Sequence, residues 1–191
     1  MQGAYLDVYP ATMMSWKQWV EAHPETEVLS KRTSGGVVGL RNESEAYQRS
    51  TRMGITDRTH VKPDDVGAKE LALGFELEGL CYSVVTAALK GSPVVMSVAG
   101  RHPIVIVRLN DGAGAKVFHA AQRILTNGAV MDGRVTFVDR LSREEWDGLT
   151  GRPRQAPEFG PVLESLQEIP SRLSYWFAWK AFFPKTVIIV H

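Results

Sequence analysis

The chain has 191 residues, and its 22 lysine and arginine residues nearly balance 21 aspartate and glutamate residues, leaving a net charge of +1. This length accommodates one compact domain, or one domain with a fragment of another. The balanced charges give no sequence-independent attraction to nucleic acid or anionic lipid, so we expect no nucleic-acid partner. The single cysteine, Cys81, excludes an intramolecular disulfide and a thiolate-rich zinc or iron–sulfur site.

The N-terminal part of the chain predicts one helix followed by a polar connector. Ser15 begins the sequence S-W-K-Q, a capping box, and apolar residues follow it at helical spacing up to Pro24. A short strand is predicted at Glu27–Leu29. Residues 42–68 are polar and show no sustained period, so we expect a connector with one helical turn at Ser44–Arg49.

From residue 69 the pattern favours strands. Large apolar residues alternate with smaller or polar ones, as in a half-buried strand, at Leu71, Leu73, Phe75 and Leu77. A short helix at Val84–Lys90 and a strand at Val94–Val98 are predicted next. Ile104–Leu109 and Lys116–Ala121 flank the turn-forming sequence N-D-G-A-G and are predicted to form a hairpin.

The C-terminal third predicts a strand, two helices and a last strand. The strand is expected at Val135–Val138, and Ser142 begins a second capping box that predicts a helix through Trp146 to Gly148. A last helix is expected at about Arg172–Phe183, followed by a strand at Thr186–Val190. The predicted fold class is therefore α+β, a mostly antiparallel sheet or partly open barrel with a few short helices.

The two ends of the chain match each other at a constant offset of 160 residues. Six residues at the N-terminal end have identical counterparts near the C-terminus: Leu6, Pro10, Trp16, Trp19, Pro24 and Thr26 correspond to Leu166, Pro170, Trp176, Trp179, Pro184 and Thr186. Tryptophans at i and i+3 place two large rings on one helix face, so a packing device is favoured over a ligand-stacking site. The second copy is apolar almost all round, which indicates that it is either deeply buried or covered by a partner.

At these residues the chain resembles a prokaryotic family known as domain of unknown function 3179. Leu80-Cys81-Tyr82-Ser83, the segment 139–151 and the segment Tyr175–Thr186 match the family's A-Y-P, D-T-G-S-W and closing W-x-x-W elements. The resemblance implies two tandem units, with residues 1–53 as the tail of a first unit plus connector. Residues 54–191 would then be a complete β-rich unit closing with a tryptophan-rich helix and a strand. The family's usual cysteine and histidine cluster is absent from this sequence, so no chemistry of that kind is inherited.

The sequence does not identify the cellular compartment. The longest apolar runs fall far short of the roughly 18 residues of a spanning helix, so no membrane span is expected. The first ten residues contain neither the basic nor the apolar region of an export signal. The resembled family, in contrast, is often exported.

His102 and His119 are the candidate metal ligands, and their arrangement depends on the hairpin turn. If Asp111-Gly112 is a two-residue turn, position 119 pairs with position 104 and His102 lies on the same face as His119. A five-residue loop places the two rings on opposite faces. Two histidines on one face could begin a metal site, but the spacing supplies no third ligand.

The candidate catalytic residues are Asp139 and His119. Asp139 ends a strand and could act as a general base, although an acidic residue before a capping box more often orders the turn. Cys81 is expected to be a buried inert thiol, because neither a histidine nor a helix N-terminus lies nearby in the sequence.

Together these observations favour a non-catalytic binding or assembly module. The expected binding residues are Trp176, Trp179 and Trp146, with a protein partner or self-association through the aromatic C-terminal helix. The alternative is a metal-binding protein or hydrolase-like enzyme that uses His102, His119 and Asp139. A third interpretation, a chain that needs a missing half, predicts association or poor solubility. The sequence identifies no cofactor.

Overall fold

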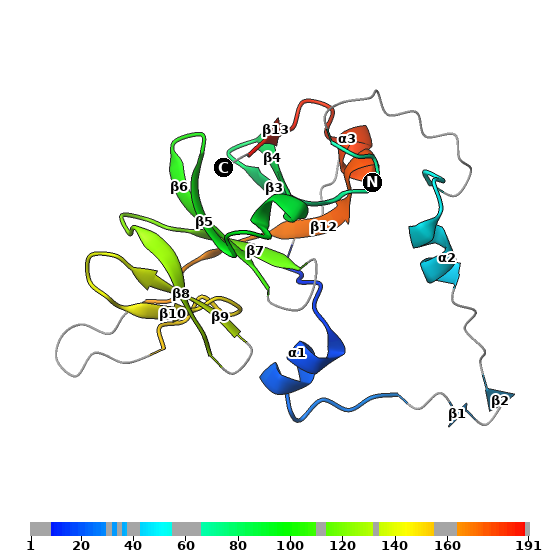
Figure 1. Cartoon of the computed structure of the whole chain (residues 1–191), viewed down its shortest axis with the longest axis horizontal. Coiled ribbons are helices and arrows are strands. Elements are labelled where there is room, and N and C mark those ends of the chain that lie inside the picture. The colour runs from blue at the N-terminus through cyan, green and yellow to red at the C-terminus, as the bar shows by residue number, and fades with distance from the viewer. Residues whose placement is uncertain are drawn as a thin grey trace, which may run out of the picture.

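The structure, a computed structural model, describes residues 9–29, 32–33, 36–37, 43–54, 66–109, 114–131, 134–154 and 164–189. Its helices are α1 (Trp16–Ala22), α2 (Glu43–Arg49), α3 (Trp176–Phe182) and the 3-10 helix η1 (Thr86–Leu89) (Figure 1). Its strands are β1 (Arg32–Thr33), β2 (Gly36–Val37), β3 (Leu71–Leu77), β4 (Leu80–Val85), β5 (Val94–Ala99), β6 (His102–Arg108), β7 (Ala115–His119), β8 (Leu125–Met131), β9 (Arg134–Asp139), β10 (Glu145–Asp147), β11 (Glu168–Ile169), β12 (Ser171–Tyr175) and β13 (Val187–Ile188).

The described strands form open, mostly antiparallel sheets, which confirms the predicted α+β class. Two four-stranded sheets have the orders β12-β3-β4-β13 and β11-β7-β6-β5, and a three-stranded sheet has the order β10-β9-β8. β1 and β2 make a separate two-stranded hairpin. Every recorded pairing is antiparallel except that of β13 with β4, which is parallel. Within the described part of the chain, no helix is long and apolar enough to cross a membrane.

Strand β3 is buried on both of its faces. Leu73 and Phe75 point into the main hydrophobic core, together with residues of β4, β5 and β6. On the opposite face Ala72 packs with Trp176 and Trp179 of α3. The alternation in this strand is therefore between large and small residues, because a helix covers the face that a half-buried strand would leave to water.

The contact of Trp179 with Gly74 fixes how closely α3 approaches the sheet. A Cβ atom built on Gly74 would lie 2.4 Å from three carbons of the Trp179 ring, so no larger residue fits at this position. The Trp179 indole nitrogen donates a hydrogen bond of 3.0 Å to Oγ1 of Thr186. The chain after α3 then joins the same sheet, because β13 pairs with β4 through Val187 and Ile188.

Several sequence predictions are confirmed. Helix α1 begins after Ser15, whose hydroxyl accepts a hydrogen bond of 3.2 Å from the backbone N–H of Gln18. The connector carries a short helix, α2. The predicted hairpin forms, and of its two alternative registers β6 and β7 adopt that of a two-residue turn, with Ile104 opposite His119. The turn residues 110–113 themselves lie outside the described residues.

The helix predicted from Ser142 to Gly148 is wrong. Glu145–Asp147 is instead strand β10, which pairs with β9, and Trp146 lies opposite Phe137. The Trp146 side chain is fully buried and its ring stacks on that of Phe137, with centroids 6.3 Å apart. Burial of this ring in the core outweighs the local capping signal, and the Ser142 hydroxyl bonds the Glu144 carboxylate in a turn.

The other corrections concern element boundaries. The last helix is shorter than predicted, because Ser171–Tyr175 forms strand β12 beside β3 and the helix begins only at Trp176. The predicted helix at Val84–Lys90 is largely replaced by the end of β4 and the short η1. No strand forms at Glu27–Leu29, where the side chains are exposed to solvent.

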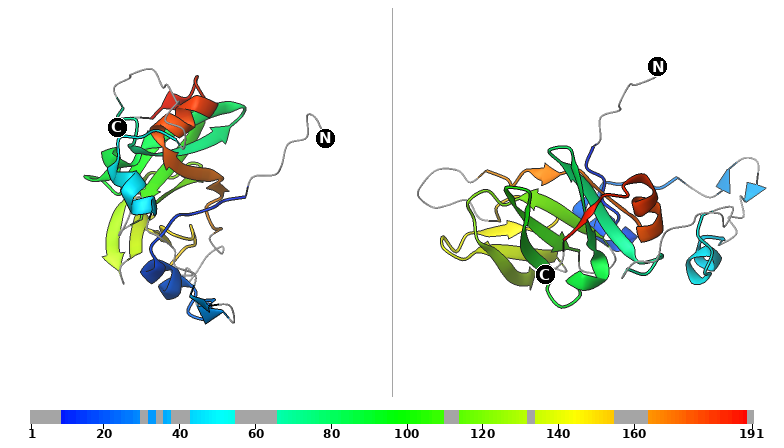
Figure 2. Two further views of the ribbon diagram at one scale, coloured as in Figure 1. Left: turned by 90° about the vertical axis from the view of Figure 1, so that its right-hand side faces the viewer. Right: turned by 90° about the horizontal axis from the view of Figure 1, so that it is seen from above.

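Helix α1 lies away from α3, on a different side of the sheets (Figures 1 and 2). One contact that holds it to the body is a hydrogen bond of 2.9 Å from the guanidinium of Arg134 to the backbone carbonyl of Glu21. The backbone of Met13 passes close to Gly114, where a Cβ atom would lie 2.2 Å from the Met13 carbonyl oxygen. These contacts involve the backbone of the segment, and the tryptophan side chains of α1 remain partly exposed.

Candidate functional site

The hairpin register places His102 and His119 on the same face of the sheet. This is the outcome expected for a two-residue turn, the first of the two alternatives that the sequence allowed. Their ring centroids lie 6.0 Å apart in an edge-to-face arrangement. Nε2 of His102 lies 2.8 Å from Oε1 of Glu78, and a guanidinium nitrogen of Arg101 lies 2.7 Å from the same oxygen. The His102 contact has ion-pair distance without hydrogen-bond geometry. Glu78 was not predicted, because it comes from the β3–β4 turn, far from His102 in sequence.

This cluster shifts the pKa of two of its members. Contact with His102, and then with Arg101, lowers the pKa of the Glu78 carboxyl below its usual value. The pKa of His119 is also lowered, first by burial and then by the neighbouring His102. His119 is therefore held toward its neutral form, which could accept a proton or bind a metal. Among the described residues, however, no group of three or more histidine, cysteine or acidic side chains is arranged to hold a metal ion.

Asp139 lies at the end of β9, in a different sheet from the two histidines. Its carboxylate accepts a hydrogen bond of 3.0 Å from the backbone N–H of Leu141, and its backbone N–H donates one of 2.9 Å to the carbonyl of Glu144. These bonds order the β9–β10 turn. Cys81 lies in β4, and burial together with the charge of Glu76 raises the pKa of its thiol, which keeps it protonated at neutral pH.

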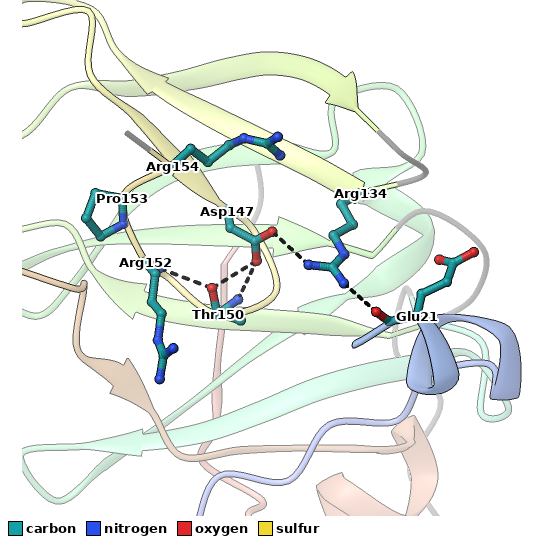
Figure 3. A pocket seen from close by; sticks show the side chains of 7 residues that line it. All are labelled: Glu21, Arg134, Asp147, Thr150, Arg152, Pro153 and Arg154. Carbon is teal, nitrogen blue, oxygen red and sulfur yellow. Dashed lines mark hydrogen bonds and ion pairs between the residues drawn. The ribbon is translucent and has the colours of Figure 1, made fainter. Parts of the chain in front are cut away.

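A pocket that the sequence did not predict opens beside β9 and β10 (Figure 3). It has a volume of about 850 Å³ and is lined by Glu21, Arg134, Asp147, Thr150, Arg152, Pro153 and Arg154. Arg134 reaches both the Asp147 carboxylate, at 3.7 Å, and the carbonyl of Glu21. The Asp147 carboxylate also accepts hydrogen bonds from Leu149 and Thr150. Figure 3 shows the guanidinium groups of Arg152 and Arg154 pointing in different directions, so the three arginines do not converge on one point.

The three tryptophans predicted to bind a partner all lie inside the protein. Trp146 and Trp176 are fully buried, and Trp179 is 4% exposed. The exposed tryptophans are the two of α1, because Trp16 is 56% exposed and Trp19 is 39% exposed. The apolar surroundings of the second pair indicated either deep burial or a covering partner, and the structure shows burial on the chain's own sheet.

The local geometry of α1 repeats that of α3 from the tryptophan pair to the threonine, whereas the N-caps differ, because the Ser15 hydroxyl caps α1 and Tyr175 makes no side-chain cap hydrogen bond. The Trp19 indole donates 2.9 Å to Oγ1 of Thr26, as Trp179 donates 3.0 Å to Thr186. Each helix ends at a residue whose N–H bonds the tryptophan carbonyl, at 2.8 Å for His23 and 2.9 Å for Phe183. The ring of this residue also packs on the tryptophan, with centroids 4.5 Å apart in the first helix and 4.2 Å in the second. The two segments differ in their surroundings, since only α3 lies on a sheet.

Comparison with known proteins supports the resemblance seen in the motifs. The family model described as "Protein of unknown function (DUF3179)" matches residues 1–186 of the chain. The match spans both the α1 segment and the α3 segment. No curated protein and no solved structure matches the chain.

The two tryptophan–threonine hydrogen bonds provide a matched test of the difference in burial. Thr186→Val leaves the buried indole N–H of Trp179 without an acceptor, and we expect a loss of about 1–2 kcal/mol in unfolding free energy. Thr26→Val leaves an indole that water can reach, so the expected change lies within about 0.5 kcal/mol. Urea unfolding of both variants measures the difference. Equal losses would contradict the unequal burial of the two helices.

The histidine pair predicts a coupled titration. The pKa of His119 is expected to lie below the usual 6.5, and His102→Gln should raise it partway by removing the neighbouring charge while burial keeps part of the shift. Because the folded-state pKa is lowered, His119 contributes stability that is fully present above the unfolded pKa. That contribution is lost as the pH falls from the unfolded toward the folded value. Titration of the imidazole resonances by NMR measures both values. A His119 pKa that does not change in the variant would contradict the predicted electrostatic coupling between the two rings.

Proposed function

The chain belongs to this family, whose description names no activity, and we propose that it is a non-catalytic assembly module that docks through residues 9–29. The supporting observation is the exposure of Trp16 and Trp19 on a helix whose geometry matches that of the buried α3. The sequence favoured the C-terminal helix as the docking surface. Because the indoles of α3 are already buried on the chain's own sheet, the proposal moves the surface to α1.

The exposure is not limited to the two tryptophans. Six large apolar side chains of this one segment are exposed: Tyr9, Met13, Trp16, Trp19, Val28 and Leu29, with Leu29 at 91%. Single exposed apolar residues are common on protein surfaces, but a concentration of large ones in a short segment is typical of an interaction site. Tryptophan and tyrosine are also the residues that most often dominate the binding energy of interfaces.

The division of the chain supports the same proposal. Residues 1–53 are proposed to be the tail of a first repeat unit plus connector, and residues 54–191 a complete second unit. The second unit has its closing helix and strand in place on β3 and β4. The α1 segment has the sequence of such a closing element, but among the described residues no second sheet accompanies it.

Fewer observations support the alternative, a metal-binding or hydrolase-like activity that uses His102, His119 and Asp139. Its favourable observation is the contact between the two imidazole rings. Asp139 contributes its carboxylate to a turn in another sheet. The docking proposal accounts for more of the molecule, because it explains why a whole segment presents apolar side chains to solvent.

Site-specific photocrosslinking in the producing cells tests the docking proposal. A photoreactive phenylalanine derivative at position 16 is expected to give a discrete adduct, which Trp19→Ala should weaken because truncating a central tryptophan costs about 2 kcal/mol or more of binding free energy. The same derivative at position 182, where Phe182 is 82% exposed on α3, is the control. The absence of a discrete adduct from position 16, or the same adducts from both positions, would contradict the proposal.

A further inference from the structure

The exposed residues of the N-terminal segment correspond to buried residues of the C-terminal one. At the offset of 160, Tyr9, Met13, Trp16, Trp19, Val28 and Leu29 match Ile169, Leu173, Trp176, Trp179, Ile188 and Ile189. Four of the C-terminal residues are buried, and the other two, Leu173 and Ile188, are partly buried against the same clusters. The residues at these six positions are therefore apolar in both segments, but they are buried or partly buried only in the C-terminal segment.

From this correspondence we propose that the partner of residues 9–29 is a second β-sheet of the same design as β12-β3-β4-β13. The proposal rests on the docking function above and specifies its partner. In the C-terminal unit, β12 pairs with β3, α3 covers the face of β3, and β13 pairs with β4. Residues 11–15, α1 and residues 27–29 occupy the corresponding places in the N-terminal segment, and they make the same contacts in the complex.

The tryptophan contact specifies the residues that the partner strand carries. Trp179 lies against Gly74, where even a Cβ atom would approach the ring to 2.4 Å, and beside the fully buried Ala72. Trp19 has the same indole-to-threonine hydrogen bond and therefore the same orientation on its helix. The partner strand accordingly has glycine under Trp19 and a small residue two positions before it.

The segment after α1 adds backbone pairing to this contact. In the C-terminal unit, Val187 and Ile188 pair in parallel with Tyr82 and Ser83 of β4. Their counterparts, Glu27 and Val28, are exposed and belong to no strand in the described structure. Addition of an extended segment to a sheet edge supplies backbone hydrogen bonds together with side-chain specificity. Residues 27–29 therefore add to the edge of the partner sheet in parallel orientation.

The sheet of a second copy of this chain fits this role less well. Its face is already covered by its own α3, whose tryptophans are buried there. A charged residue also replaces a buried apolar one, because Phe177 is 6% exposed whereas its counterpart Lys17 has a side chain that is 80% exposed. Burying an ammonium group is costly even with Glu21 at 4.0 Å on the same helix, so the partner sheet presents an acidic group or an open edge opposite Lys17.

A graft into the full chain tests whether this segment can close such a sheet. Residues 171–189 are replaced by the sequence of residues 11–29, with Phe177 kept so that no lysine is buried. The grafted chain is expected to unfold in a single cooperative transition and to keep the acrylamide quenching of the native Trp176 and Trp179. The same graft with Trp179→Ala, or with Gly74→Val, should lose the cooperative transition. A graft that unfolds, or that exposes its indoles, overturns the proposal.

Crosslinking from position 28 identifies the partner surface directly and separates the two proposals. An adduct that maps to an edge strand of a sheet with glycine on the adjacent strand is the expected result. An adduct from residue 28 on α1 of a second copy, or on a helix of another protein, overturns the sheet partner while leaving docking through residues 9–29 intact. The absence of an adduct from both positions 16 and 28 overturns the docking function itself.

Discussion

The packing of Trp179 on Gly74 is the contact on which the rest of the C-terminal unit depends. It brings α3 close to β3, so that both faces of this strand are buried and the strand becomes part of the core rather than its boundary. The hydrogen bond from the same indole to Thr186 then directs the chain from the end of α3 into β13. One side chain thus joins a helix, a sheet face and a sheet edge, which is why the segment has such a specific sequence.

The N-terminal segment carries the same tryptophan pair, so the same packing constraint applies to it. α1 has the same indole-to-threonine hydrogen bond and the same aromatic contact at its end as α3, and the Ser15 hydroxyl caps it in addition, so its conformation is set locally. Local bonds of this kind stabilise a short helix only weakly, and most helical stability in proteins comes from packing an apolar face. A segment that keeps its apolar face exposed is therefore incomplete in energetic terms, and docking on a sheet would supply what it lacks.

Sequence reasoning succeeded where a local pattern and the tertiary structure agree. The Ser15 cap, the hairpin formed by β6 and β7, and the strand at Leu71–Leu77 all follow from spacing and turn chemistry. It failed at residues 142–148, where a good capping box lies in a turn because burial of Trp146 is worth more than a helical cap. The boundary between β12 and α3 was also missed, since apolar residues on both sides of Tyr175 fit either element.

The candidate site was also predictable only in part, because its residues come from segments that lie far apart in the sequence. The sequence allowed one hairpin register that places His102 and His119 on one face and another that does not, and Glu78 reaches His102 from a turn that no short-range pattern reveals. The pocket beside Arg134 has no motif at all, because its lining comes from α1, β9 and the loop after β10. The apolar surroundings of the second tryptophan pair indicated either deep burial or a covering partner, and the structure shows that this pair is buried while the first pair is exposed.

Hydrogen exchange of the five tryptophan indole N–H groups, followed by NMR in the dilute isolated chain, tests this account most directly. Trp19 and Trp179 make nearly identical hydrogen bonds, so a difference in their exchange rates reports burial rather than local bonding. We expect the Trp179 indole to exchange slowly, with global unfolding, and the Trp19 indole to exchange rapidly. Equal protection of the two indoles would contradict the account in which α3 is covered by the chain's own sheet and α1 is not.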